Sequence, residues 1–149
     1  MERRRLTSGT VWERKAGFAR LVQAGPFVAI AGTVAAEEDG KPASPTAAGQ
    51  ANFIFKKFAD LLGRVGGDLG SVVRLRLYYV DAGVEAGFLE ALEEAFPGGA
   101  PALTTVRVAH LVSPEFHLEL EADAFLDLPG VEEQRPRRRR DDDEPEASD

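Results

Sequence analysis

The sequence contains no cysteine, a single methionine, a single tryptophan and no long apolar run. Without cysteine the chain can form no disulfide, no zinc–thiolate site and no thiol nucleophile, so nothing points to an oxidising compartment. No stretch approaches the roughly 20 apolar residues that a membrane span needs. The basic N-terminus lacks the apolar segment of a secretory signal. We therefore expect a cytoplasmic protein that has no membrane partner.

Positive charge is also scarce, since 18 Lys and Arg stand against 25 Asp and Glu, for a net charge of −7. Binding to a phosphate backbone needs a basic surface, so we do not expect a nucleic-acid partner. The last residues, 131–149, join a run of arginines directly to a run of acids and contain too few apolar residues to form a core. We expect one folded domain over residues 1–130 and a disordered charged tail over residues 131–149.

Hydrophobic periodicity predicts the element order β-β-α-β-α-β-β. Alternating or short apolar runs indicate strands over residues 20–23, 27–31 and 71–81, and two further β-patterned runs within residues 101–125, the second of them over residues 117–125. Apolar residues at three- and four-residue steps indicate amphipathic helices over residues 47–65 and 84–96. This order implies an α+β sandwich, with two helices on one face of a single mixed sheet.

The last predicted strand carries a row of carboxylates on its polar face, from Glu119, Glu121 and Asp123. Such a row repels itself unless cations lie opposite, and the strand at 71–81 offers Arg74 and Arg76. The mixed face either contacts solvent or forms the core of an oligomer in which opposite charges pair. The pattern alone leaves both interpretations open.

A series of short segments resembles the RidA superfamily, also called the YjgF/YER057c/UK114 family. The resemblance covers about residues 12–126 and rests on the order of GFARLVQAG, FVAIAGTV, a single Gln50, LGSVVRLRLYYVD, EEAF, PALTTVRVAHL and LELEADAF. It implies a chorismate-mutase-like fold and a homotrimer whose sheets line a central barrel, with three clefts between subunits. The best-known members hydrolyse enamines and imines such as 2-aminoacrylate and 2-iminobutanoate. Others are described as endoribonucleases that inhibit translation, or as ligand-binding proteins.

The position of Leu103 departs from the deaminating members. In those proteins an Arg two residues after the Pro of this segment clamps the substrate carboxylate through paired, charge-assisted hydrogen bonds. Leu103 offers no donor, and Arg107 on the same strand lies four residues, or roughly 13 Å, further along. The direction of Arg20, on a neighbouring segment, is left open by the sequence. The chain is therefore identified as a member of an Arg-lacking subgroup.

The resemblance also implies the other residues of the cleft. Glu119 corresponds to a Glu that activates water, and it is the one candidate catalytic residue; the alternative is a structural ion pair with an Arg. The expected ligand-binding residues, which make the cleft more apolar than in deaminating members, are Phe18, Ala31, Gly32, Leu103 and Thr105.

These patterns favour a homotrimer whose intersubunit clefts bind a small metabolite, without 2-iminobutanoate deaminase activity. The alternative is an enamine or imine hydrolase in which Glu119 positions water. An endoribonuclease is a further, less favoured alternative, because the fold is acidic. No cofactor and no metal are expected, since no glycine-rich phosphate loop is present and His110 and His117 match no standard ligand spacing.

Overall fold

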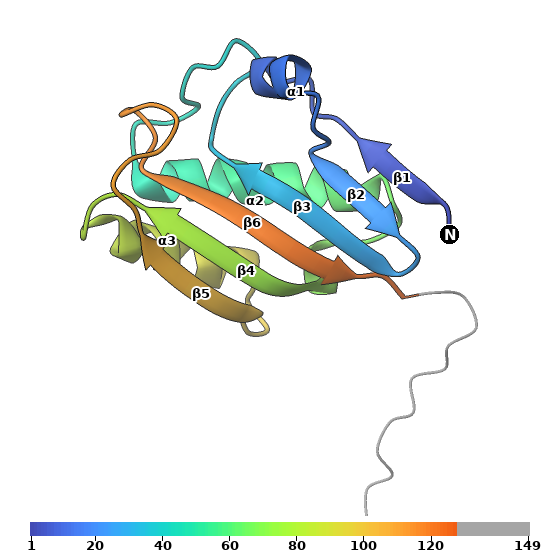
Figure 1. The fold of residues 1–149 in the computed structure, drawn as a ribbon. Helices are drawn as coiled ribbons and strands as arrows, with labels where there is room; N and C mark the ends of the chain where they lie inside the picture. The colour runs from blue at the N-terminus through green and yellow to red at the C-terminus, as the bar shows by residue number, and fades with distance from the viewer. Residues whose placement is uncertain (128–149) are drawn as a thin grey trace, which may run out of the picture.

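Alternating apolar side chains build a single mixed sheet, which Figure 1 shows with the long helices behind it. The structure is a computed structural model that describes residues 1–127. The elements are β1 (Arg3–Leu6), α1 (Val11–Ala16), β2 (Leu21–Ala24), β3 (Phe27–Thr33), α2 (Ala47–Gly63), β4 (Val72–Tyr79), α3 (Val84–Ala95), β5 (Ala102–Arg107) and β6 (Leu118–Phe125), with a 3₁₀ turn at Leu69–Ser71. The six strands of this described part run in the order β1-β2-β3-β6-β4-β5. Only β4 and β5 pair in parallel within it. The α+β class and the single mixed sheet are confirmed.

The helices α2 and α3 cover one face of the sheet, as predicted from their apolar stripes (Figure 1). Thr46 caps α2 by accepting a hydrogen bond from the backbone N–H of Gly49. Phe55, Phe58 and Phe88 from the two helices are buried against Leu, Val and Ala side chains of the strands. This packing fixes α2, which also contributes to the functional site described below.

Two short elements near the N-terminus were not predicted. Strand β1 pairs antiparallel with β2 and buries only Leu6, so its three arginines hide the strand pattern. Helix α1 has six residues, and Thr10 and Glu13 form its capping box. The Thr-x-x-Glu spacing was a usable signal for this helix. The fold thus has a third helix, which lies beyond the end of the sheet rather than on its covered face (Figure 1).

Strand β4 departs from simple alternation at its start. The pairing with β6 shifts between Val72 and Arg74, which is a β-bulge. Val72 is therefore buried, whereas Val73, which simple alternation with Leu75 and Leu77 predicts on the apolar face, is 46% exposed. From Leu75 onward the predicted alternation holds, because Leu75 and Leu77 are fully buried.

Two of the carboxylates on β6 meet one cation and one hydroxyl of β4 within the same chain. Arg76 Nη1 lies 3.2 Å from a carboxylate oxygen of Asp123 and 3.7 Å from one of Glu121. The Tyr78 hydroxyl donates a hydrogen bond of 2.6 Å to Glu121. These cross-strand contacts relieve the repulsion that the sequence pattern implied.

Strand β5 lies at one edge of the sheet, and every residue of it is exposed. The two β-patterned runs at 101–125 are β5 and β6, which are not neighbours, because β4 lies between them. Within residues 1–127 no helix is long and apolar enough to cross a membrane. The charged segment 131–149, predicted to be a disordered tail, lies outside the described residues.

Candidate functional site

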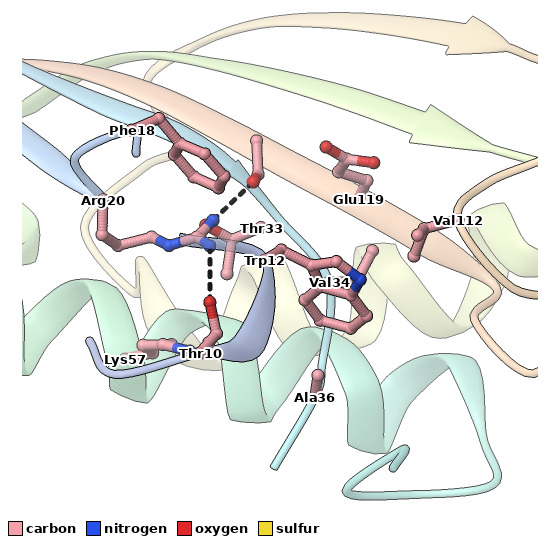
Figure 2. A pocket seen from close by; sticks show the side chains of 11 residues that line it. Thr10, Trp12, Phe18, Arg20, Thr33, Val34, Ala36, Lys57, Val112 and Glu119 are labelled. Carbon is pink, nitrogen blue, oxygen red and sulfur yellow. Dashed lines mark hydrogen bonds between the residues drawn. The ribbon is translucent and has the colours of Figure 1, made fainter. Parts of the chain in front are cut away.

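A pocket of about 250 Å³ opens where β3 and β6 approach α1 and α2 (Figure 2). Its lining is largely apolar, and it includes the charged side chains of Arg20, Lys57 and Glu119. A mostly apolar cavity with a few convergent polar groups is the usual form of a small-molecule site. The full lining consists of Thr10, Trp12, Phe18, Arg20, Gly32, Thr33, Val34, Ala36, Lys57, Val112 and Glu119.

The pocket forms at an irregularity between β3 and β6. The pairing of the two strands shifts between Ile30 and Thr33, and Gly32 lies within this shift. A Cβ at Gly32 would collide with the carboxylate of Glu119. The absence of a side chain at Gly32 therefore makes room for the Glu119 carboxylate, and the bulge directs this group into the pocket.

Glu119 is a partly desolvated carboxyl group. Burial raises the pKa of Glu119, the charge of Arg20 lowers this pKa in part, and Glu121 raises it further. The ion pairs of Arg76 go to Glu121 and Asp123, and within residues 1–127 Glu119 takes part in no ion pair. A carboxyl group with a raised pKa beside a cavity is a candidate for proton exchange with a ligand.

Arg20 is buried, and its guanidinium is held by groups of the protein itself. Its Nη1 donates hydrogen bonds to the Gly32 carbonyl, at 2.6 Å, and to the Thr33 hydroxyl, at 3.1 Å. Its Nη2 donates to the Thr10 hydroxyl at 3.4 Å and lies 3.6 Å from the Glu13 carboxylate. The sequence left the direction of Arg20 open, and the structure places it along the pocket wall. The terminal nitrogens of Arg20 are thus already engaged.

Two features of Arg20 bear on a ligand. Its Cζ lies 5.0 Å from the centre of the Phe18 ring, so the aromatic face covers the cation. Its Nε is buried and has no hydrogen-bond partner among the described residues. A buried donor without an acceptor is rare in folded proteins.

Glu13 anchors the support beneath Arg20. Its carboxylate accepts hydrogen bonds from the backbone and side chain of Ser8, both at 2.7 Å, and from the backbone N–H of Thr10 at 3.0 Å. Burial raises the pKa of Glu13, but the bonds from Thr10 and Ser8 outweigh it and lower this pKa to about 2. Glu13 is therefore a stable anion that fixes Arg20 in place.

The aromatic wall of the pocket belongs to a second apolar cluster. Trp12 and Phe116 meet edge to face, with their ring centres 6.2 Å apart, and they pack with Val34 and Ala36. Phe116 and Ala36 are buried, so the wall is supported from behind. Packing of this kind holds a pocket open in one shape.

Gln50 fixes the loops on either side of this wall. Its side-chain N–H groups donate to the carbonyls of Ser44 and Glu115, both at 3.0 Å. Its side-chain oxygen accepts from the backbone N–H of His117 at 2.8 Å. Gln50 is fully buried, and it joins α2 to a segment 65 residues further along the chain. It thereby positions the segment that carries Val112.

Lys57 reaches the pocket from α2, and it is half-buried. Burial lowers the pKa of Lys57, and the charge of Arg20 lowers it further, while Glu13 and Glu37 act in the opposite direction. No carboxylate lies within ion-pair distance of Lys57 in the described part of the chain. Lys57 is therefore a second group in the pocket whose charge state can change.

Three of the predicted site residues line this pocket, namely Phe18, Gly32 and Glu119. Ala31, Leu103 and Thr105 do not line it within the single chain. Leu103 and Thr105 lie on β5, two strands away from β6, and both are exposed. Their expected place in a cleft depends on a neighbouring subunit, and it stays a prediction.

Sequence patterns missed several lining residues. Lys57 follows Lys56 in the chain, and nothing in the sequence distinguishes a lysine that faces a pocket from its exposed neighbour. Trp12 sits on α1, and Val112 lies in the long connection between β5 and β6, neither of which has a periodic pattern. The single tryptophan beside a capping signal was the one signal for this wall.

The fold agrees with that of known proteins. The family model described as Endoribonuclease L-PSP matches residues 12–126. The chain therefore belongs to this family, and its predicted place in the RidA/YjgF superfamily is confirmed.

The similarity to individual proteins covers most of this chain. The chain is 30% identical to a crystal structure of a YjgF/YER057c/UK114 family member from Mycobacterium tuberculosis, with a TM-score of 0.76 over 84% of this chain and 100% of that one. It resembles the structure of yeast Mmf1 with 21% identity and a TM-score of 0.74, over 85% of this chain and 100% of that one. An uncharacterized protein of Streptomyces coelicolor is 28% identical over 122 residues, which cover 82% of this chain and 91% of that protein.

Proposed function

We propose that this protein is a homotrimeric, metabolite-binding member of an Arg-lacking subgroup of its family, and that its pocket accepts an uncharged or weakly polar small molecule. The observation that carries the proposal is the largely apolar pocket, in which the terminal nitrogens of Arg20 are already bonded to Gly32, Thr33 and Thr10. A ligand carboxylate would have to displace these bonds to obtain a bidentate partner.

The same arrangement argues against deamination of 2-iminobutanoate. Leu103 stands where deaminating members carry the carboxylate clamp, and a leucine supplies no hydrogen-bond donor. Glu119 adds a further obstacle, because its carboxylate and the carboxylate of the substrate would repel each other in a partly desolvated pocket. A desolvated carboxylate without a partner costs several kcal/mol by order of magnitude. We therefore expect no efficient turnover of this substrate.

The exposed edge strand supports an oligomer. Leu103 and Val106 of β5 are 36% and 41% exposed, and Val73 of the neighbouring β4 is 46% exposed. An edge strand that presents apolar side chains and open backbone groups is prone to pair with another chain unless it is covered. A neighbouring subunit on β5 would cover these residues and would bring Leu103 and Thr105 toward a cleft.

Binding is tested by thermal-shift screening of uncharged metabolites against the purified protein. We expect stabilisation by some neutral compounds that is lost in Phe18→Ala, because the ring and the cation beneath it form one wall of the pocket. Val112→Ala should reduce the stabilisation that the same compounds give. If no neutral compound raised the melting temperature of the protein and small carboxylates did, the proposal would be contradicted.

A second candidate function is hydrolysis of an enamine, an imine or a related labile bond by an enzyme that has no carboxylate clamp. Glu119 favours it, because its raised pKa and its place in the pocket suit a group that transfers a proton to or from water. Ammonia release from freshly generated 2-iminobutanoate is measured for the wild type and for Glu119→Ala. Absence of turnover in both agrees with ligand binding, whereas turnover that the variant loses would establish an enzyme despite Leu103.

The family name also raises ribonuclease activity. The net charge of −7 and the apolar pocket give little support for contact with a polyanion. Incubation of the protein with a labelled single-stranded RNA should leave the RNA intact.

A further inference from the structure

Lys57 differs from the other three lysines of the chain. Lys15, Lys41 and Lys56 are exposed, and Lys41 lies 3.7 Å from the carboxylate of Asp39. Lys57 is half-buried, and it lines the pocket that also contains Glu119. Lys57 is thus the one lysine of the chain that is partly withdrawn from solvent.

The surroundings of Lys57 favour its neutral amine. The pocket around it is largely apolar, and the nearby guanidinium of Arg20 is a like charge. Glu13 and Glu37 act in the opposite direction, but neither lies within ion-pair distance of Lys57. The Glu13 carboxylate is already held by Ser8 and Thr10. Desolvation beside another cation is one of the ways in which proteins make a lysine nucleophilic.

Arg20 lines the same pocket and is only 3% exposed, and its terminal nitrogens are bonded within the protein. A guanidinium held in this way keeps its positive charge in the wall of the pocket. The pocket thus combines an amine without an ion-pair partner in residues 1–127, a fixed cation and an apolar wall, which together suit an aldehyde or a ketone with an apolar substituent.

We propose that Lys57 condenses with an aldehyde or ketone that binds in this pocket. The lone pair of Lys57 Nζ attacks the carbonyl carbon, the carbonyl π bond breaks, and a proton passes from Nζ to the oxygen to give a carbinolamine. Loss of water, whose oxygen is the former carbonyl oxygen, then gives an imine on Nζ. Addition of water reverses both steps, so the reaction needs no other reactant. Glu119 lines the same pocket and can carry the proton.

This inference rests on the proposed function in one respect, because it places the ligand in the same pocket. It goes further by assigning a reversible covalent step, a nucleophile and a class of ligand. In Figure 2, Lys57 enters beside Thr10 from α2, while Glu119 lies on β6 across the pocket. The two groups therefore approach a bound molecule from different elements.

Trapping of the imine tests the proposal. The full-length protein is incubated with butanal and sodium cyanoborohydride at neutral pH, and the alkylated lysines are located by fragment mass spectrometry. The chain has only four lysines and an N-terminal amine, so each site can be assigned. We expect Lys57 to carry most of the label at early times. Lys57→Arg should lose this label, whereas the matched variant Lys56→Arg should retain it.

Formaldehyde, which needs no apolar pocket, separates amine reactivity from recognition. The quantity to compare is the ratio of Lys57 labelling to Lys56 labelling. A higher ratio with butanal than with formaldehyde supports the proposal. If labelling instead followed the exposure of the lysines, with Lys15, Lys41 and Lys56 labelled before Lys57, the proposal would be overturned. This outcome is seen with the wild-type protein alone, so it does not depend on the folding of any variant. In that case, thermal stabilisation by neutral compounds would still support ligand binding, so the two proposals fail separately.

Discussion

The carboxylate of Glu119 occupies the space that a side chain at Gly32 would need. The two residues lie on neighbouring strands, β3 and β6, at the point where the pairing of these strands is irregular. A backbone feature of one strand therefore sets the position of the reactive group on the other.

Gly32→Ala should displace the Glu119 side chain and destabilise the protein by about 1–3 kcal/mol, as overpacking commonly does. Ligand-induced thermal stabilisation should fall with it. Gly63→Ala is the matched control, because a Cβ there meets nothing within 4 Å and the residue ends helix α2. Urea unfolding of both variants checks the difference, and equal stability would show that Glu119 moves aside freely.

Glu119→Gln should raise stability relative to the wild type as the pH increases. Burial raises the pKa of Glu119, so the folded state holds its proton to a higher pH than the unfolded state does. The corresponding stability is fully present below the unfolded pKa of about 4.3 and is lost as the pH rises through the folded pKa. Glutamine resembles the protonated form throughout. Denaturant unfolding is measured below and above this window. The variant and the wild type should be equally stable in acid, and the variant should be more stable at neutral pH. The control Glu90→Gln, at an exposed position, should have the stability of the wild type at both pH values.

Glu13→Gln should have the opposite pH dependence. The pKa of Glu13 is lowered to about 2, so its stabilisation is present above the unfolded pKa and is lost as the pH falls toward about 2. We expect a cost of about 1–3 kcal/mol at neutral pH, typical of lost hydrogen bonds to a charged group. Urea unfolding at neutral and acidic pH tests this. Glu93→Gln, an exposed change on α3, should stay within about 0.5 kcal/mol of the wild type.

Val106→Glu should weaken the assembly. Light scattering of the wild type should give the mass of a trimer, and the variant should shift toward the monomer, because a charge on the exposed edge strand opposes burial there. Leu89→Glu is the control, since Leu89 is a comparably exposed apolar residue on α3, 53% exposed. A monomeric wild type would contradict the proposed trimer.

Leu103→Arg should add a carboxylate clamp if β5 reaches the pocket of a neighbouring subunit. Detectable ammonia release from 2-iminobutanoate in this variant, with none in the wild type, is the expected result. Leu103→Gln controls for a polar but uncharged side chain. If the Leu103→Arg variant formed a trimer but remained inactive, Phe18 and Ala31 would also prevent the reaction, or β5 would not reach the pocket of a neighbouring subunit.

Much of the fold followed from periodicity. The helices α2 and α3 and strand β6 have long, regular apolar patterns, and each lies within two residues of its predicted bounds. Strand β1 did not stand out, because arginines fill three of its four positions. Val73 was misplaced, because a bulge shifts the facing of every residue before it, and no local sequence signal marks the bulge.

The candidate site was less predictable, since it depends on contacts between distant residues. Phe18, Gly32 and Glu119 were found through family resemblance, and they do meet in one pocket. Lys57 was missed, because its significance comes from its depth and from the guanidinium of Arg20, which lies 37 positions earlier in the chain. Neither property is visible in the pattern of the helix that carries it.

The strand order has a consequence for how the chain folds. Strand β6, the last of the described strands, lies in the middle of the sheet and is the sole hydrogen-bonded link there between β1-β2-β3 and β4-β5. Figure 1 shows it running between β3 and β4. During synthesis the earlier strands cannot join into one sheet until residues 118–125 have left the ribosome. Glu119 arrives on that same strand, so the nascent chain completes its sheet and its pocket in a single late event.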